Sequence, residues 1–211
     1  MEIFSARRLT NMGLIAAIYV VATMLCSSLA YGQVQFRISE VLMLLCYFNK
    51  DYIISLSIGC LIVNLFSTLG MVDVVFGTLA TVVAAVLIYL LRNKVNLVVA
   101  SLFPVISNAV IVGFELTYVF KTPLLVNMGW VALGEFVCVT IVGVILIKAL
   151  MKNKYFSKLV TFGMSDQALS EQFKNGLRFR YKNQPDFLVR LYFLAFLTKK
   201  LRKSIDKVRV I

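Results

Sequence analysis

The chain contains 28 consecutive uncharged residues between Arg8 and Arg37, most of them apolar. An α-helix needs about 20 mostly apolar residues to cross the hydrocarbon core of a bilayer, so this run predicts a spanning helix within residues 9–31. Four further apolar stretches of similar length follow, at residues 52–69, 74–91, 95–119 and 128–147. Only 15% of the residues are charged, whereas soluble domains carry roughly 25%. The sequence therefore predicts an all-α membrane protein.

A sixth apolar segment, residues 41–48, is too short to cross a bilayer in the same way. It lies between Glu40 and the polar run that begins at Asn49. At about 1.5 Å per residue it falls well short of a hydrocarbon core of about 30 Å. Two interpretations stay open. The segment is re-entrant, or it is a full span that starts near Val34 and carries Arg37 and Glu40 in its first turns.

The distribution of Lys and Arg predicts the orientation, because cytoplasmic loops of membrane proteins collect these residues. Six spans with a cytoplasmic N-terminus leave only Arg37 and Lys121 in the outer loops. The same arrangement puts the remaining basic residues inside: Arg7, Arg8, Lys50, Arg92, Lys94 and all those from Lys148 onward. Five spans would place the basic C-terminal segment outside. We therefore expect six transmembrane helices, the second one short, with cytoplasmic N- and C-termini.

The C-terminal segment differs in composition from the rest of the chain. Residues 154–211 hold 13 of the 22 Lys and Arg residues but only 4 of the 10 Asp and Glu residues. Apolar residues at helical spacing run through residues 185–208, with basic residues around them. We expect a membrane domain at residues 1–153 and a basic tail at 154–211, whose amphipathic helix lies on anionic lipid. The apolar stripe is too continuous for a solvated arm that binds nucleic acid.

Polar residues fall mainly in the outer half of the predicted bundle. Ionisable groups within a membrane are costly, so they face the bundle interior or a wet cavity and indicate binding or transport. This pattern predicts a pocket open to the outside. Its candidate polar residues are Arg37, Glu40, Asn64, Asp73, Asn108, Glu115 and Glu135, and its candidate aromatic walls are Phe36, Phe114, Tyr118 and Trp130.

Several of these residues also have a purely structural interpretation. Asp73 would cap the N-terminus of the helix at residues 74–91. Arg37 and Glu40 would pair with each other at a spacing of three residues. Glu115 would be held by Lys121. Each alternative predicts a different partner for the side chain concerned.

Several classes of protein chemistry have no residues to support them. The chain has no His, which removes histidine metal sites and the usual general base. It has no phosphate-binding loop of the GxxxxGK[ST] type, so any ATP hydrolysis belongs to another subunit. Its four cysteines lie within apolar runs and form no CxxC pair, which indicates packing. We expect a protein that is not an enzyme and needs no cofactor or metal.

Two long runs resemble one family in particular. They are VQFRISEVLMLL at residues 34–45 and GCLIVNLFSTLGMVDVVFGTLATVVAA at residues 59–85. The chain is similar to the QueT family over roughly residues 9–150. The matching positions are Phe36, Arg37, Ser39 and Glu40 in the first run, then Asn64, Gly70, Asp73 and Gly77 in the second.

The resemblance implies a function. QueT proteins are substrate-capture (S) components of energy-coupling-factor (ECF) importers in the cell membrane, and they are associated with 7-deazaguanine precursors of queuosine. The implied partners are an ECF membrane-coupling subunit and two ATPase subunits. Gly13 and Ala17 form a small-residue face on the first helix, similar to the docking surface of S components. Residues 154–211 have no counterpart in the family pattern.

The chemistry of a deazaguanine suggests a division of roles. We expect Glu135 or Glu115 to accept hydrogen bonds from its pyrimidine edge, while Asp73 and the pair Arg37 and Glu40 order the lid loops. Three alternatives remain. The chain could be an independent secondary carrier or channel, an S component for another vitamin, or a membrane scaffold that acts through its tail.

Cysteine labelling tests the orientation. In a background that lacks the four native cysteines, we expect Asn93→Cys to react with a membrane-impermeant maleimide only after the membrane is opened. Thr122→Cys, in the next predicted loop, should react in intact cells and serves as the matched control. Labelling of residue 93 in intact cells would contradict six spans with cytoplasmic ends.

Overall fold

The computed structural model describes residues 6–27 and 35–162 of the chain. The chain divides into two compact units, Met1–Gly176 and Leu177–Ile211, and all of the described residues belong to the first. Within them every regular element is a helix. The amphipathic helix predicted at residues 185–208 lies outside the described residues, as does most of the predicted tail.

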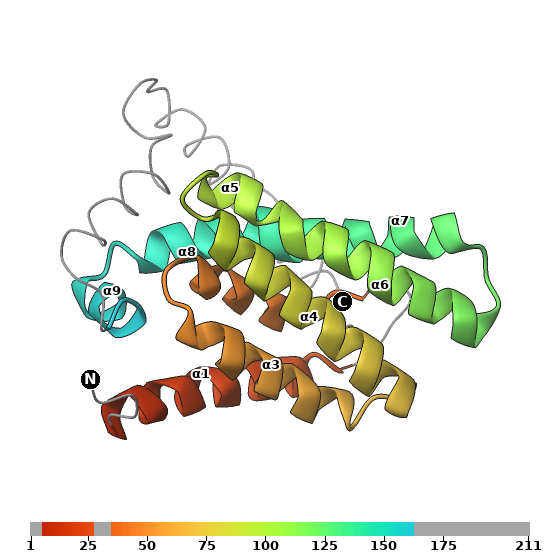
Figure 1. The fold of residues 1–211 in the computed structure, drawn as a ribbon, viewed down its shortest axis with the longest axis horizontal. Coiled ribbons are helices and arrows are strands. Elements are labelled where there is room, and N and C mark those ends of the chain that lie inside the picture. The colour runs from red at the N-terminus through yellow and green to blue at the C-terminus, as the bar shows by residue number, and fades with distance from the viewer. Residues whose placement is uncertain (1–5, 28–34, 163–211) are drawn as a thin grey trace, which may run out of the picture. The chain divides into compact units, whose positions relative to one another are not determined.

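Four helices are long and apolar enough to cross a membrane, which confirms the all-helical membrane class. The first is α1 (Ala6–Leu25), and the second is α4 (Met71–Leu91) (Figure 1). The third combines α5 (Leu97–Ala100) with α6 (Leu102–Phe120), and the fourth combines α7 (Leu124–Glu135), η2 (Phe136–Gly143) and α8 (Val144–Leu150). Two shorter apolar helices, η1 (Ile38–Tyr47) and α3 (Asp51–Asn64), complete the bundle. The number of six spans stays a prediction.

The short second segment, η1, is a 3₁₀ helix at the centre of the bundle. Eight of its ten side chains are buried, and it contacts α1, α3, α4, α5, η2 and α8. Residues 35–37 before it are not helical, so the helix does not extend back toward Val34. At about 2.0 Å per residue it is about 20 Å long. Leu44, Tyr47 and their neighbours form the middle of the main apolar core.

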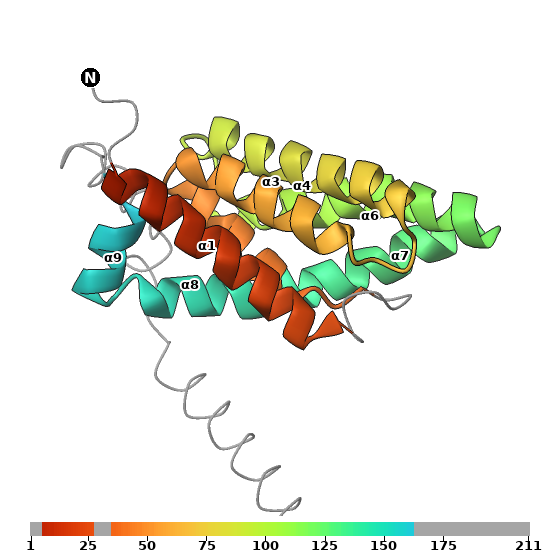
Figure 2. The ribbon, with the colours of Figure 1, turned by 90° about the horizontal axis from the view of Figure 1, so that it is seen from below.

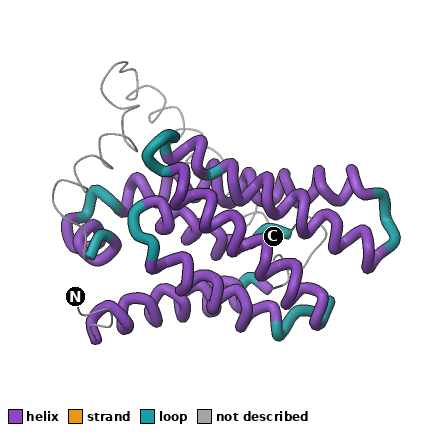
Figure 3. The backbone as a smooth tube through the Cα atoms, in the orientation of Figure 1, coloured by secondary structure: helices purple, strands orange, loops and turns teal. Residues whose placement is uncertain are grey.

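The other helices follow one another side by side around η1. Helix α3 contacts both α1 and α4, α4 contacts α6, and α6 contacts α7, as the two perpendicular views show (Figures 1 and 2). Apart from η1, helices that follow one another in the chain are therefore also neighbours in the bundle. Short loops suffice for most connections (Figure 3). This arrangement puts the candidate site residues on neighbouring elements: η1, the end of α3, the start of α4, α6 and the end of α7.

Two of the long helices are irregular for identifiable reasons. The break between α5 and α6 falls at Ser101, three residues before Pro104. A proline ring clashes with the carbonyl four residues earlier, here that of Ala100. The fourth span changes from α-helix to π-helix directly after Glu135. Segments of π-helix are frequent at functional sites.

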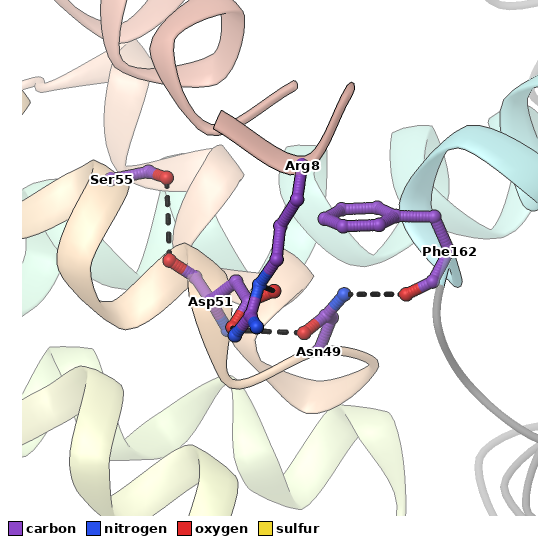
Figure 4. A network of polar contacts seen from close by, with 5 residues as sticks. All are labelled: Arg8, Asn49, Asp51, Ser55 and Phe162. Atoms are coloured by element: carbon purple, nitrogen blue, oxygen red, sulfur yellow. Dashed lines mark hydrogen bonds and ion pairs between the residues drawn. The ribbon is translucent and has the colours of Figure 1, made fainter. Parts of the chain in front are cut away.

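A polar network ties three segments together at one end of the bundle (Figure 4). The guanidinium of Arg8 on α1 donates two hydrogen bonds to Asp51 at the start of α3, one of them 2.6 Å long. Asn49 accepts a bond from the Asp51 amide at 3.0 Å and donates to the carbonyl of Phe162 at 3.2 Å. The segment after α9 (Lys154–Val160) is thereby attached to the bundle.

Close packing of α6 on α7 depends on a glycine. A Cβ atom added at Gly113 would lie 2.7 Å from Met128 Cγ and 3.1 Å from Met128 Cα. A Cβ atom added at Gly129 on α7 would meet nothing within 4 Å. In a membrane, helices associate through such small residues because lipid supplies no hydrophobic driving force between them.

We predict that Gly113→Ala is less stable than Gly129→Ala by about 1–3 kcal/mol, the usual cost of overpacking. Both changes add the same helix propensity, so the comparison isolates the contact with Met128. Thermal unfolding of the purified variants in detergent measures the difference. Equal stability would mean that α6 and α7 are not packed this closely.

Candidate functional site

Seven polar residues predicted for the site are all buried. Each is at most 4% exposed: Arg37, Glu40, Asn64, Asp73, Asn108, Glu115 and Glu135. We call these seven residues the polar cluster. They come from η1 and the residue before it, the end of α3, the first turn of α4, α6, and the last residue of α7. Hydrogen bonds connect Arg37 with Asn64 and Asn108 with Glu135.

Arg37 and Glu40 do not hold one another, although three residues separate them. Arg37 Nη2 donates a 2.6 Å hydrogen bond to Asn64 Oδ1. Glu40 Oε1 accepts a 2.6 Å hydrogen bond from the hydroxyl of Tyr19. Tyr19 is on α1 and is fully buried. The two charged residues therefore connect η1 to α3 and to α1, respectively.

Asn64 and two glycines shape the corner between α3 and α4. Asn64 Nδ2 donates to the backbone carbonyl of Asp73 at 3.1 Å. Gly70 has a φ of +63° and precedes the first residue of α4, a conformation that favours glycine. A Cβ atom at Gly77 would lie 2.8 Å from Asn64 Nδ2 and would overlap Asp73 Oδ1. No side chain caps α4, so Asp73 does not act as the predicted cap.

Asn108 and Glu135 join α6 to α7 within the cluster. Asn108 Nδ2 donates to Glu135 Oε1 at 2.9 Å. The other carboxylate oxygen of Glu135 is buried without a hydrogen-bond partner among the described residues. The π-helix η2, which begins directly after Glu135, packs against η1. Glu135 thus belongs to the side of the cluster that includes η1 and α6.

Glu115 has no hydrogen-bond partner for either oxygen within the described part of the chain. Its side chain is fully buried. Helix α6 packs against α4, and Ser107 donates a 3.0 Å hydrogen bond to the carbonyl of Ala80. Because the two helices run in opposite directions, Glu115 lies at about the same level as Asp73. Lys121, the predicted partner, instead places its ammonium 4.7 Å from the ring centre of Tyr118. Glu115 therefore lies on the side of the cluster that includes the α3–α4 corner.

The buried side-chain atoms without partners all belong to the residues named above. In the part of the chain that the structure describes they are Arg37 Nε, Glu40 Oε2, both carboxylate oxygens of Glu115, and Glu135 Oε2. An unpaired buried polar group costs about 1–3 kcal/mol, and more if charged, so folded proteins keep few of them. All five atoms belong to residues of the polar cluster. The arrangement therefore suits a polar ligand that offers several donors and one acceptor.

The predicted aromatic walls lie elsewhere. Trp130, Phe114 and Tyr118 are 44%, 53% and 61% exposed, and only Phe36 packs partly against the buried core. The structure does not bring Trp130 into the polar cluster, and its role in binding stays a prediction. Tyr19 was not anticipated from the sequence, because nothing near it in the chain marks it as polar. Within the described residues no group of His, Cys, Asp and Glu could hold a metal ion.

Comparisons with known proteins agree on one family. The family model described as "QueT transporter" matches residues 9–152. The Queuosine precursor transporter QueT of Lactococcus lactis subsp. cremoris (strain MG1363) is 37% identical over 143 residues, which cover 61% of this chain and 83% of that protein. No solved structure matches the chain.

Matched tyrosine variants test the charge of Glu40. We predict that Tyr19→Phe lowers the free energy of unfolding by about 1.5–3 kcal/mol, because it removes a hydrogen bond to a charged group. Tyr47→Phe removes a 2.9 Å bond to the neutral carbonyl of Val95 and should cost about 0.5–1.5 kcal/mol. Chemical denaturation in detergent gives both values. An equal cost would argue that Glu40 is uncharged in the folded chain.

Proposed function

The chain belongs to the QueT transporter family, and from this premise we propose that it captures a 7-deazaguanine precursor of queuosine at the outer face of the cell membrane. It is a multi-pass membrane protein of a transporter family rather than an enzyme. The observation that carries the proposal is that five buried atoms of the polar cluster lack a partner within the described part of the chain. No other described residue has such an atom.

The base of the ligand fits the side of the cluster around Glu135. A deazaguanine presents two adjacent donors on its pyrimidine edge, the ring N–H and the exocyclic amine. A carboxylate accepts both, and charge-assisted bonds of this kind are about twice as strong as neutral ones. Glu135 is fixed by Asn108 and keeps one oxygen unpartnered. The amide of Asn108 or Arg37 Nε can donate to the carbonyl beside that edge.

The positions of η1 and the α3–α4 corner would be fixed by Arg37, Asn64 and Asp73. The bond from Arg37 to Asn64 and the bond from Asn64 to the Asp73 carbonyl connect the start of η1 with the α3–α4 corner. Glu40, held by Tyr19, fixes η1 against α1. These residues order the loops that close over the ligand, while Glu135 and Glu115 make direct contact with it.

Transport then depends on separate subunits. We propose an ECF membrane-coupling subunit and two ATPase subunits as partners, because the chain lacks a phosphate-binding loop. The docking surface is the exposed face of α1, where Gly13 and Ala17 lie among the exposed side chains Leu14, Ile18 and Val21. Small residues there allow a partner helix to approach closely. The basic C-terminal residues would lie on anionic lipid of the inner leaflet.

Binding by the purified chain tests the ligand. We predict that Glu135→Gln lowers the affinity for a 7-deazaguanine about 5- to 150-fold, because one acceptor becomes a donor at a cost of about 1–3 kcal/mol. Asp51→Asn changes a carboxylate outside the cluster and should bind like the parent. Isothermal titration calorimetry measures all three proteins. A parent chain that binds no 7-deazaguanine would refute the proposal.

Uptake tests the partners. An independent carrier would transport ligand alone, whereas a capture subunit transports only when its ATPase module is present. We expect Gly13→Leu to bind ligand normally but to lose most uptake in cells, because the bulky side chain blocks docking. Gly129→Leu, which also adds a side chain in open space, should retain uptake. Uptake by the chain alone in proteoliposomes would favour the carrier.

A further inference from the structure

The polar cluster has an imbalance of charge. Among its members in the described structure, Arg37 is a cation, whereas Glu40, Asp73, Glu115 and Glu135 are carboxylic acids. Unbalanced charge within a membrane is costly, and buried charges in proteins are normally paired. A single guanidinium cannot balance four carboxylates, so further positive charge or protonation is required.

The lack of positive charge is most evident at Glu115. Glu40 has the hydroxyl of Tyr19 as a donor, and Glu135 has the amide of Asn108. Glu115 has no donor for either oxygen among the described residues, and a second acid, Asp73, lies at about the same level of the neighbouring helix α4. Lys121 lies against the ring of Tyr118 instead. A fully buried, unpartnered carboxylate beside a second one is a site for a donor with positive charge.

We propose that Glu115, with Asp73 beside it, is a subsite for a primary ammonium group of the ligand. The chain would therefore prefer a 7-deazaguanine with a cationic aminomethyl substituent over analogues with an uncharged one. This inference rests on the proposed function. An ammonium has three N–H donors and no acceptor, which matches the two free oxygens of Glu115 and the neighbouring carboxylate.

The spacing within α6 supports two distinct subsites. Asn108, which holds Glu135, and Glu115 are seven residues apart and so lie on the same face of the helix. At 1.5 Å per residue they are separated by about 10 Å along its axis. A fused two-ring base with a short substituent spans a comparable length. One end of the ligand can therefore meet Glu135 while its substituent meets Glu115.

A metal ion is a poorer occupant, because no group of three possible ligand residues exists among the residues described. A protonated Glu115 would also relieve the imbalance, but it would not distinguish a charged substituent from a neutral one. Ligand selectivity therefore decides between an ammonium subsite and a protonated acid.

The experiment compares two ligands on the purified full-length chain by calorimetry at neutral pH. One is the 7-deazaguanine with an aminomethyl group, and the other carries a nitrile at the same position. We expect the aminomethyl compound to bind at least about tenfold more tightly. Equal affinity, or preference for the nitrile, would overturn the ammonium subsite and leave the proposed function standing. If neither compound binds, the proposed function fails and the subsite fails with it.

Two variants test whether Glu115 causes the preference for the aminomethyl ligand. Glu115→Gln should reduce the affinity ratio of the two ligands to about one, whereas Glu115→Asp, which keeps the charge, should retain most of it. Glu135→Gln is the matched control, because it should weaken both ligands and leave their ratio unchanged. A ratio that persists in Glu115→Gln would place the ammonium elsewhere and overturn the assignment.

Discussion

The hydrogen bond from Arg37 to Asn64 is the interaction on which the rest of the site depends. It holds a guanidinium, buried where η1 begins, against the last residue of α3. Asn64 can accept this bond because its amide nitrogen is directed to the backbone of Asp73. The absence of a side chain at Gly77 leaves room for the amide of Asn64 and the carboxylate of Asp73. One asparagine therefore positions the cation, the α3–α4 corner and the first turn of α4.

The fold makes this arrangement possible by enclosing a short helix. Because η1 is surrounded by other helices, the polar residues at its start face protein rather than lipid. The cost of burying Glu40 and Arg37 is offset in part by Tyr19 and Asn64. Asn108 does the same for Glu135 on α7. The atoms that remain unpartnered are on Arg37, Glu40, Glu115 and Glu135. We propose that the partner of these atoms is the transported solute.

The long apolar helices and the burial of the seven polar residues could be predicted because both follow from simple counts. Long apolar runs define the helices, and charged residues within such runs are rare enough to mark a site. Rotation about a helix axis is harder to predict: Trp130, predicted for the site, is 44% exposed, and its role in binding stays a prediction. Tyr19 was missed because tyrosine is common in apolar helices, and its contact with Glu40 depends on tertiary packing. The 3₁₀ form of η1 and the π-helix after Glu135 likewise have no local sequence signature.

In the proposed mechanism, the polar cluster binds the transported solute. The most direct measurement is an experimental structure of the purified chain with a 7-deazaguanine bound. We predict that donors of the ligand lie within about 3.2 Å of the carboxylates of Glu135 and Glu115, so that the unpartnered oxygens of both residues gain partners. A ligand bound away from these two carboxylates, with their oxygens still unpartnered, would contradict the claim.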